Sequence, residues 1–213
     1  MEVKEKPTFE MYHMPTGLVG WIVAWAYMVF ELVLRIVLKK AIRKFDELID
    51  LQPDDYLLDV ACGSGVYLQK HASHVHRITG IDLNDIQISL ARRRNRKRIA
   101  AGTAEIVLGD SAALPWEDNR FSVVYCNCHH CFAELRKSVQ EMHRVLRPGG
   151  RAVIGFAYNP DEVKARKNEQ KWKCHCWTEA EILKMMNDGG FPHVSVDRTW
   201  AKKGALTIKA FKQ

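Results

Sequence analysis

Histidine and cysteine side chains crowd into one short segment of this 213-residue chain, CNCHHCF at residues 126–132. A histidine in such a place can serve as a general base and remove a proton from a reacting group. We therefore take His129 and His130 as candidate catalytic residues, or as substrate ligands, with a loop pair that has no chemistry as the competing interpretation. Cys128 and Cys131 have a spacing that structural zinc also uses, but we expect no metal site here.

The chain has six cysteines, which are Cys62, Cys126, Cys128, Cys131, Cys174 and Cys176. Disulfide frameworks are typical of short secreted domains, and the charged, mixed start of this chain does not resemble a cleavable signal peptide. We expect reduced thiols in a cytoplasmic compartment, with most of them acting as small buried hydrophobes. Because soft thiolates prefer soft ions, thiol-based binding of a metalloid such as arsenite is an alternative.

A second group of residues that could bind a ligand lies in and after the segment LLDVACGSGVYL at residues 57–68. A strand that ends in Asp59 leads into a turn of small residues at 61–65, and a helix follows. Such a turn lets backbone approach a ligand closely, and the first turn of the helix offers unpaired N–H groups. The next strand ends in Asp82, 23 residues after Asp59, where an acid can accept hydrogen bonds from a ribose.

The elements that would position these residues alternate between strands and helices. We expect strands at 56–61, 77–83, 104–110, 121–127, 151–158, 193–200 and 205–212, and helices at 64–73, 84–100, 134–146 and 178–190. The sequence PGG at 148–150 indicates a turn, and the last two strands alternate like an antiparallel pair. This order predicts an α/β fold with a mostly parallel sheet, helices on both faces, and ligands at the carboxyl ends of the strands.

Four motifs in this order, LLDVACGSG, GIDLN, GDSAALPWEDNRFSVVYCN and EMHRVLRPGGRAVI, resemble class I S-adenosylmethionine-dependent methyltransferases. LPWEDNRFSVV and LRPGG are similar to the branch that contains quinone-biosynthesis and other small-molecule enzymes. The resemblance covers roughly residues 45–213. It implies a Rossmann-like, doubly wound, mostly parallel seven-stranded sheet with a terminal antiparallel strand, and S-adenosyl-L-methionine as the cofactor.

For the methionine part of that cofactor, the resemblance implies contacts from Asp59 and from the turn through Gly63 and Gly65. The carbonyl of Asn127, at the end of the fourth strand, would meet the methionyl amine. The sequence departs from the commonest pattern at Ala61, where the family often has glycine.

For the adenosine part, the resemblance implies that Asp82 takes the ribose hydroxyls and that Leu83 packs on the adenine. Asp110 would reach the adenine amino group, helped by the backbone at Ser111. From the residues alone, Asp82 could be an acid that the dipole of the following helix favours at its N-terminus, and Asp110 could be a turn residue.

The N-terminal segment at residues 17–45 is uncharged up to Phe30 and then becomes basic, with Lys39, Lys40, Arg43 and Lys44. Its length and its aromatic residues favour membrane association, either as a span or as an in-plane helix. A hydrophobic helix that caps the domain's own active site is the competing interpretation. We therefore divide the chain into residues 1–44, a hydrophobic helix with a basic flank, and residues 45–213, the methyltransferase domain.

The chain has a formal charge of +7, and its strongest basic run is ARRRNRKR at residues 91–98. A solvated helix face is the simplest explanation of that run, and no nucleic-acid-binding module is visible. The family resemblance implies methyl transfer, and with the N-terminal segment it leads us to expect a small or lipidic acceptor at a membrane surface. The alternatives are thiol-dependent methylation of a metalloid and a non-catalytic binding protein that kept the cofactor fold.

Overall fold

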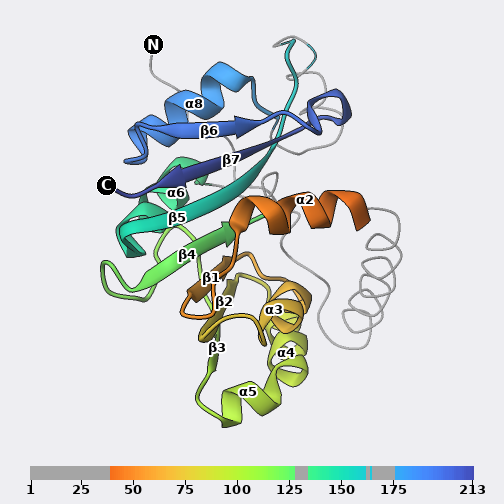
Figure 1. Cartoon of the computed structure of the whole chain (residues 1–213), viewed down its shortest axis with the longest axis vertical. Helices are drawn as coiled ribbons and strands as arrows, with labels where there is room; N and C mark the ends of the chain where they lie inside the picture. The colour runs from red at the N-terminus through yellow and green to blue at the C-terminus, as the bar shows by residue number, and fades with distance from the viewer. Residues whose placement is uncertain (1–38, 128–133, 162–163, 165–175) are drawn as a thin grey trace.

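In the described part of the chain, seven strands form one sheet with helices on both faces (Figure 1). The computed structural model describes residues 39–127, 134–161, 164 and 176–213. The strands are β1 (Tyr56–Val60), β2 (Arg77–Asp82), β3 (Ala104–Leu108), β4 (Phe121–Cys126), β5 (Leu146–Ala157), β6 (Val194–Asp197) and β7 (Ala205–Phe211). The helices are α2 (Lys39–Ile49), α3 (Val66–His71), α4 (Asp85–Arg94), α5 (Arg96–Ala100), α6 (Leu135–Val145), α8 (Glu179–Asp188) and the 3-10 helix η2 (Ala201–Lys203).

The strand order is β3-β2-β1-β4-β5-β7-β6. Neighbouring strands from β3 to β5 pair in parallel, while β7 pairs antiparallel with both β5 and β6. The order reverses direction between β1 and β4, which is the switch point where open α/β sheets bind ligands. The predicted fold class, including the antiparallel strand at the end of the chain, is confirmed.

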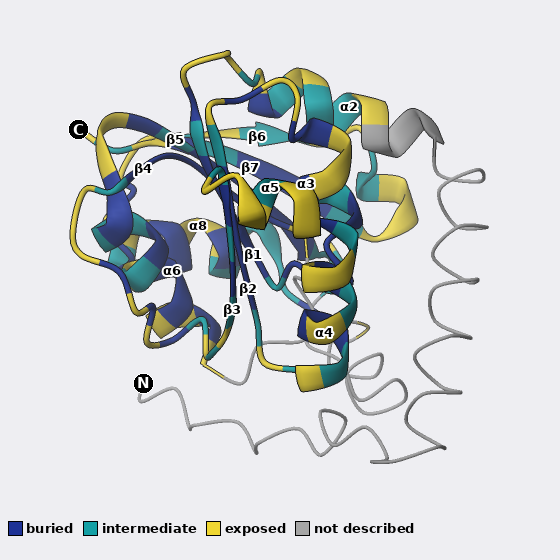
Figure 2. Cartoon of the chain, turned by 90° about the horizontal axis from the view of Figure 1, so that it is seen from below, coloured by how far each residue is buried: buried dark blue, intermediate teal, exposed yellow. Residues whose placement is uncertain are grey.

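The sheet is buried on both faces because successive side chains of a strand point in opposite directions. In β1, Leu57 belongs to the hydrophobic cluster under α2, α3 and α4, while Leu58 belongs to the cluster under α6 and α8. Figure 2 shows the central strands in the buried colour between these helices. The helices on both faces therefore hold the parallel strands, and the loops at their carboxyl ends, in place.

Two local predictions differ from the structure. The helix expected at 84–100 is divided at Asn95, whose backbone leaves the helical region (φ −101°, ψ 13°) and whose buried side-chain amide donates to the carbonyls of Ala91 and Gly65. The expected turn at PGG lies inside β5, where the register with β4 jumps from Leu146 to Arg151. Gly149 has a φ of 73°, so the strand accommodates the extra residues as a local bulge.

Helix α8 begins and ends as its sequence predicts. The Thr178 side chain accepts a hydrogen bond from the Glu181 amide, and the Glu181 carboxylate accepts one from the Thr178 amide. Gly189 ends the helix. This reciprocal pairing satisfies amide donors that a helix start otherwise leaves open.

The predicted N-terminal helix lies mostly outside the described residues, which begin at residue 39. Its basic end forms α2, which runs across the expected boundary between residues 44 and 45. None of the helices in the described ranges has the length and apolar character that crossing a membrane requires.

Candidate functional site

The turn between β1 and α3 has an unusual backbone at three positions. Ala61, Gly63 and Gly65 have φ angles of 58°, 51° and 69°, in the left-handed region that favours glycine. The turn is pinned at one end because the Cys62 amide donates to the Ile81 carbonyl at 3.0 Å. Ala61 adopts a conformation that glycine adopts without steric cost, so a glycine would fit this position.

Asp82 joins this turn to the loop that follows β2. Its Oδ2 accepts a hydrogen bond from the Gly63 amide at 2.9 Å, and its Oδ1 accepts one from the Asn84 amide at 2.9 Å. The Asp82 carbonyl also accepts from the Gly109 amide, just after β3. The ends of β1, β2 and β3 are therefore held together around one residue, Asp82, through its carboxylate and its backbone carbonyl.

Asp59 lies buried in β1, paired in register with Gly80 on one side and with Tyr125 on the other. Burial raises the pKa of the Cys62 thiol well above its usual value, and the charges of Asp59 and Asp82 raise it further. Burial and the charge of Asp59 likewise raise the pKa of Tyr125. Burial, together with the charges of Asp59 and Asp82, therefore keeps the Cys62 thiol protonated, and those two negative charges favour a cationic ligand.

The loops after β2 and β3 present the residues that we predicted for adenosine. Leu83 is 54% exposed, so its side chain is accessible at the start of the loop after β2. Asp110 is exposed and its Oδ1 accepts from the Ala112 amide at 2.9 Å, which forms an Asx-type turn. Ser111 Oγ lies 2.8 Å from Ser138 Oγ, so the loop is tied to α6.

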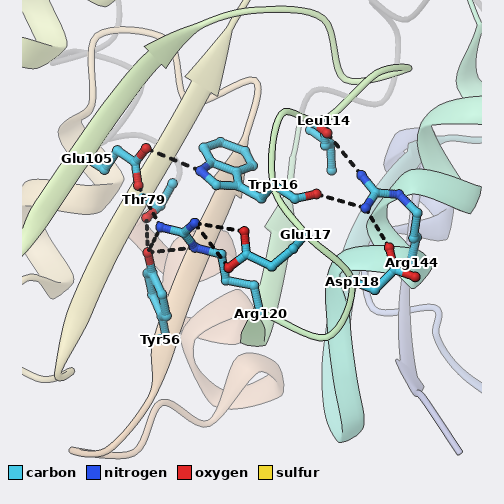
Figure 3. A network of polar contacts seen from close by, with 9 residues as sticks. All are labelled: Tyr56, Thr79, Glu105, Leu114, Trp116, Glu117, Asp118, Arg120 and Arg144. Atoms are coloured by element: carbon cyan, nitrogen blue, oxygen red, sulfur yellow. Dashed lines mark hydrogen bonds and ion pairs between the residues drawn. The ribbon is translucent and has the colours of Figure 1, made fainter.

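An arginine on α6 holds the rest of this loop, and sequence reasoning did not single it out. Arg144 donates to the carbonyls of Leu114 and Trp116 at 2.9 and 2.8 Å, and to Oδ1 of Asp118 at 2.8 Å (Figure 3). Its Nε donates to Glu141, whose second oxygen accepts from the Leu114 amide. One side chain thereby fixes several backbone groups of the loop that carries Asp110.

A second arginine anchors the far end of the same loop to the start of the sheet. Arg120 Nη2 donates to the Tyr56 hydroxyl and to Glu105, both at 3.0 Å (Figure 3). Trp116 is buried and its indole N–H donates to the other oxygen of Glu105 at 3.3 Å. The tryptophan and the acidic residues of the segment at 116–118 therefore hold the loop between β3 and β4 in place.

Helix α2 packs beside the site through aromatic rings. Phe45 meets Tyr125 edge to face at 6.0 Å, and Tyr125 stacks on Tyr67 of α3 at 4.0 Å. Asp46 of α2 lies with its Oδ1 3.0 Å from His71 Nε2. The residues nearest the N-terminal segment are therefore coupled to the end of β4, a contact that periodicity does not reveal.

The remaining predicted residues are only partly described. Asn127 is exposed after β4, and its side chain bonds to the Tyr125 hydroxyl. The candidate bases His129 and His130 lie outside the described residues.

Three of the six cysteines, Cys128, Cys131 and Cys174, also lie outside the described residues. The other three, Cys62, Cys126 and Cys176, are buried free thiols, as expected for small apolar side chains. Among the described residues no cluster of histidine, cysteine and acidic side chains is arranged to hold a metal ion.

Comparison with known proteins gives a consistent result. Residues 58–154 match the family described as a methyltransferase domain. The chain is 33% identical over 125 residues to 24-methylenesterol C-methyltransferase 2 of Arabidopsis thaliana, covering 58% of this chain and 35% of that protein. It is 30% identical over 122 residues to demethylmenaquinone methyltransferase of Symbiobacterium thermophilum, covering 55% and 49% of the two chains. The chain therefore spans about a third to a half of the length of these curated relatives.

Among solved structures, geranyl diphosphate C-methyltransferase from Streptomyces coelicolor has a similar fold. The TM-score is 0.63 at 18% identity, and the match covers 80% of this chain and 79% of the other. That crystal contained geranyl diphosphate, Mg²⁺ and S-adenosyl-L-homocysteine. At this identity the similarity establishes the fold alone.

Proposed function

We propose that this protein transfers the methyl group of S-adenosylmethionine to a small or lipidic acceptor, because residues 58–154 match the methyltransferase-domain family. The family resemblance inferred from the sequence motifs is confirmed by that domain match. The observation that supports the proposal is the position of Asp82. Its carboxylate accepts hydrogen bonds from the Gly63 and Asn84 amides, so the predicted motifs after β1 and β2 lie side by side.

The residues present suit this cofactor. In the proposal, Asp59 and the turn through Gly63 and Gly65 hold the methionine part, and the carbonyl of Asn127 accepts from its amine. The two carboxylates whose charges raise the pKa of Cys62, Asp59 and Asp82, favour a positively charged ligand. When bound, S-adenosylmethionine supplies a methyl group that its sulfonium sulfur has already activated.

The other end of the site suits an adenosine. Asp82 is held by backbone amides in one orientation, so its carboxylate is prepared to accept from ribose hydroxyls. The half-exposed Leu83 offers an apolar surface for the adenine, and Asp110 with the backbone of Ser111 would accept from and donate to the ring. Orienting the cofactor in this way is the main task of the protein, because in-line transfer needs a near-attack geometry more than it needs extra chemistry.

We assign the acceptor to the small-molecule or lipid class. The support is that the relatives are named for 24-methylenesterol and demethylmenaquinone, and the similar crystal structure for geranyl diphosphate. In this proposal His129 or His130 removes a proton from the acceptor where its nucleophile carries one. The thiol-dependent metalloid alternative gains no support from the described cysteines, which are buried.

The test of the cofactor site is a titration of the intact protein with S-adenosylhomocysteine. Asp82→Ala should weaken binding by roughly 1–3 kcal/mol, the cost of leaving polar partners unpaired. Asp85→Ala is the matched control, because Asp85 is an exposed acid three residues away in the first turn of α4. Absence of binding by the wild-type protein, or equal affinities of the two variants, would contradict the proposal.

Action at a membrane surface is a separate part of the proposal, supported by the apolar and basic composition of residues 17–45. The full chain should sediment with vesicles that contain anionic lipid, and a chain that begins at residue 39 should stay in solution. Sedimentation of both chains would instead implicate basic residues of the domain itself.

A further inference from the structure

The basic run at residues 91–98 includes two side chains that bind the turn after β1. Arg94, the last residue of α4, uses a single nitrogen, Nη1, to donate to the Ser64 carbonyl at 2.8 Å and to the Ser64 hydroxyl at 2.6 Å. Asn95 is buried, and its amide group donates to the Gly65 carbonyl at 3.3 Å. The end of α4 therefore holds the turn at Ser64 and Gly65, next to the Gly63 amide that Asp82 binds.

These contacts act on a part of the turn that has left-handed backbone geometry. Gly65 has a φ of 69°, and a Cβ on it would lie 2.9 Å from both Ala91 Cβ and Asn95 Nδ2. The turn is thus gripped between Asp82, which binds its Gly63 amide, and the last turn of α4, which binds its carbonyls. A left-handed turn persists when its surroundings fix it from several sides.

We propose that Arg94 is a positioning residue for the cofactor, acting through Ser64 to hold the β1–α3 turn in its binding geometry. The inference rests on the proposed function, in which this turn meets the methionine part of S-adenosylmethionine. Arg94 does not itself touch the reacting atoms. Its loss should therefore affect ligands that carry the methionine part more than ligands that lack it.

The experiment compares two ligands by isothermal titration, S-adenosylhomocysteine and 5′-methylthioadenosine, which has no amino-acid part. For Arg94→Ala we expect S-adenosylhomocysteine to bind about tenfold more weakly, equivalent to about 1.4 kcal/mol. The affinity for 5′-methylthioadenosine should change less than threefold. Arg93→Ala is the matched control, because the Arg93 side chain is the exposed neighbour on the same helix, and this variant should bind both ligands as the wild type does.

Arg94→Lys provides a rescue variant. Both contacts to Ser64 come from one nitrogen, and a lysine ammonium has three donors that can serve the same two acceptors. We expect this variant to regain most of the lost affinity. In a double-mutant cycle, Ser64→Ala should cost less in the Arg94→Ala background than in the wild type.

Three results would overturn the inference. Wild-type affinity of Arg94→Ala would show that the contact does not position the turn. Equal losses for both ligands, together with a lower unfolding temperature, would show a purely structural role. If the wild-type protein binds neither ligand, the proposed function fails and the inference fails with it, which separates that case from the first two.

Discussion

Replacing Arg144 by alanine tests whether one arginine holds the loop between β3 and β4. The change removes the donors to the Leu114 and Trp116 carbonyls, the pair with Asp118, and the two bonds to Glu141. Leu114 and Trp116 are buried, so water does not readily replace the lost partner. Glu141 keeps its bond from the Leu114 amide, so the loop should loosen rather than detach.

The magnitude follows from the groups left unpaired. Two buried carbonyls without a partner cost about 1–3 kcal/mol each, and the pair with the exposed Asp118 adds about 0–1 kcal/mol. Because neighbouring losses are not additive, we expect Arg144→Ala to lower the free energy of unfolding by about 3 kcal/mol. At about 2–4 °C per kcal/mol for a chain of this size, the unfolding temperature should fall by about 6–12 °C.

Urea denaturation and calorimetry at pH 7 measure this effect. Arg147→Ala is the control, because Arg147 is exposed three residues further along, and the expected change is within about 0.5 kcal/mol. Arg144→Lys should fall between them, because a lysine ammonium cannot span the same set of acceptors. Hydrogen bonds from Arg144 hold the pKa of Glu141 below its usual value, so that pKa should rise in Arg144→Ala. A loss below about 1 kcal/mol would refute the reasoning.

Two further changes test the turn and the acid stability. Gly65→Ala should unfold at a lower urea concentration than Gly102→Ala: both have φ near 70°, but only at Gly65 does the new Cβ meet Ala91, which adds about 1–3 kcal/mol. Equal midpoints would contradict the steric argument. Burial alone raises the pKa of Asp55, but hydrogen bonds and the charge of Arg151 outweigh it and leave that pKa below its usual value of 3.8. The resulting stability is present above about pH 4 and is lost as the pH falls through the lower folded-state pKa. Asp55→Asn should therefore lose stability less steeply than the wild type as the pH falls. An unchanged slope of the unfolding free energy against pH in acid would refute this.

The fold was largely predictable because each strand carries its own signal. Short apolar runs ending in Asp59 and Asp82 indicated buried parallel strands, and the alternation at residues 193–200 and 205–212 indicated an antiparallel strand pair at the end of the chain. The helix start at Thr178 was equally local, since its cap and Glu181 are three residues apart. The break at Asn95 was not predictable, because the Asn95 side chain bonds to the carbonyl of Gly65, thirty residues earlier, as well as to that of Ala91.

The site divides in the same way. Residue types and spacing, together with the family resemblance, predicted Asp59, Asp82 and the glycine turn as a ligand site, because a ligand-binding turn needs those types at strand ends whatever surrounds them; their role with the cofactor stays a prediction. Only the tertiary structure showed that Arg94 and Arg144, which resemble ordinary surface charges in the sequence, bind loop carbonyls. Their partners are backbone carbonyls, which every residue has, so nothing in the sequence marks the pairing until the chain has folded.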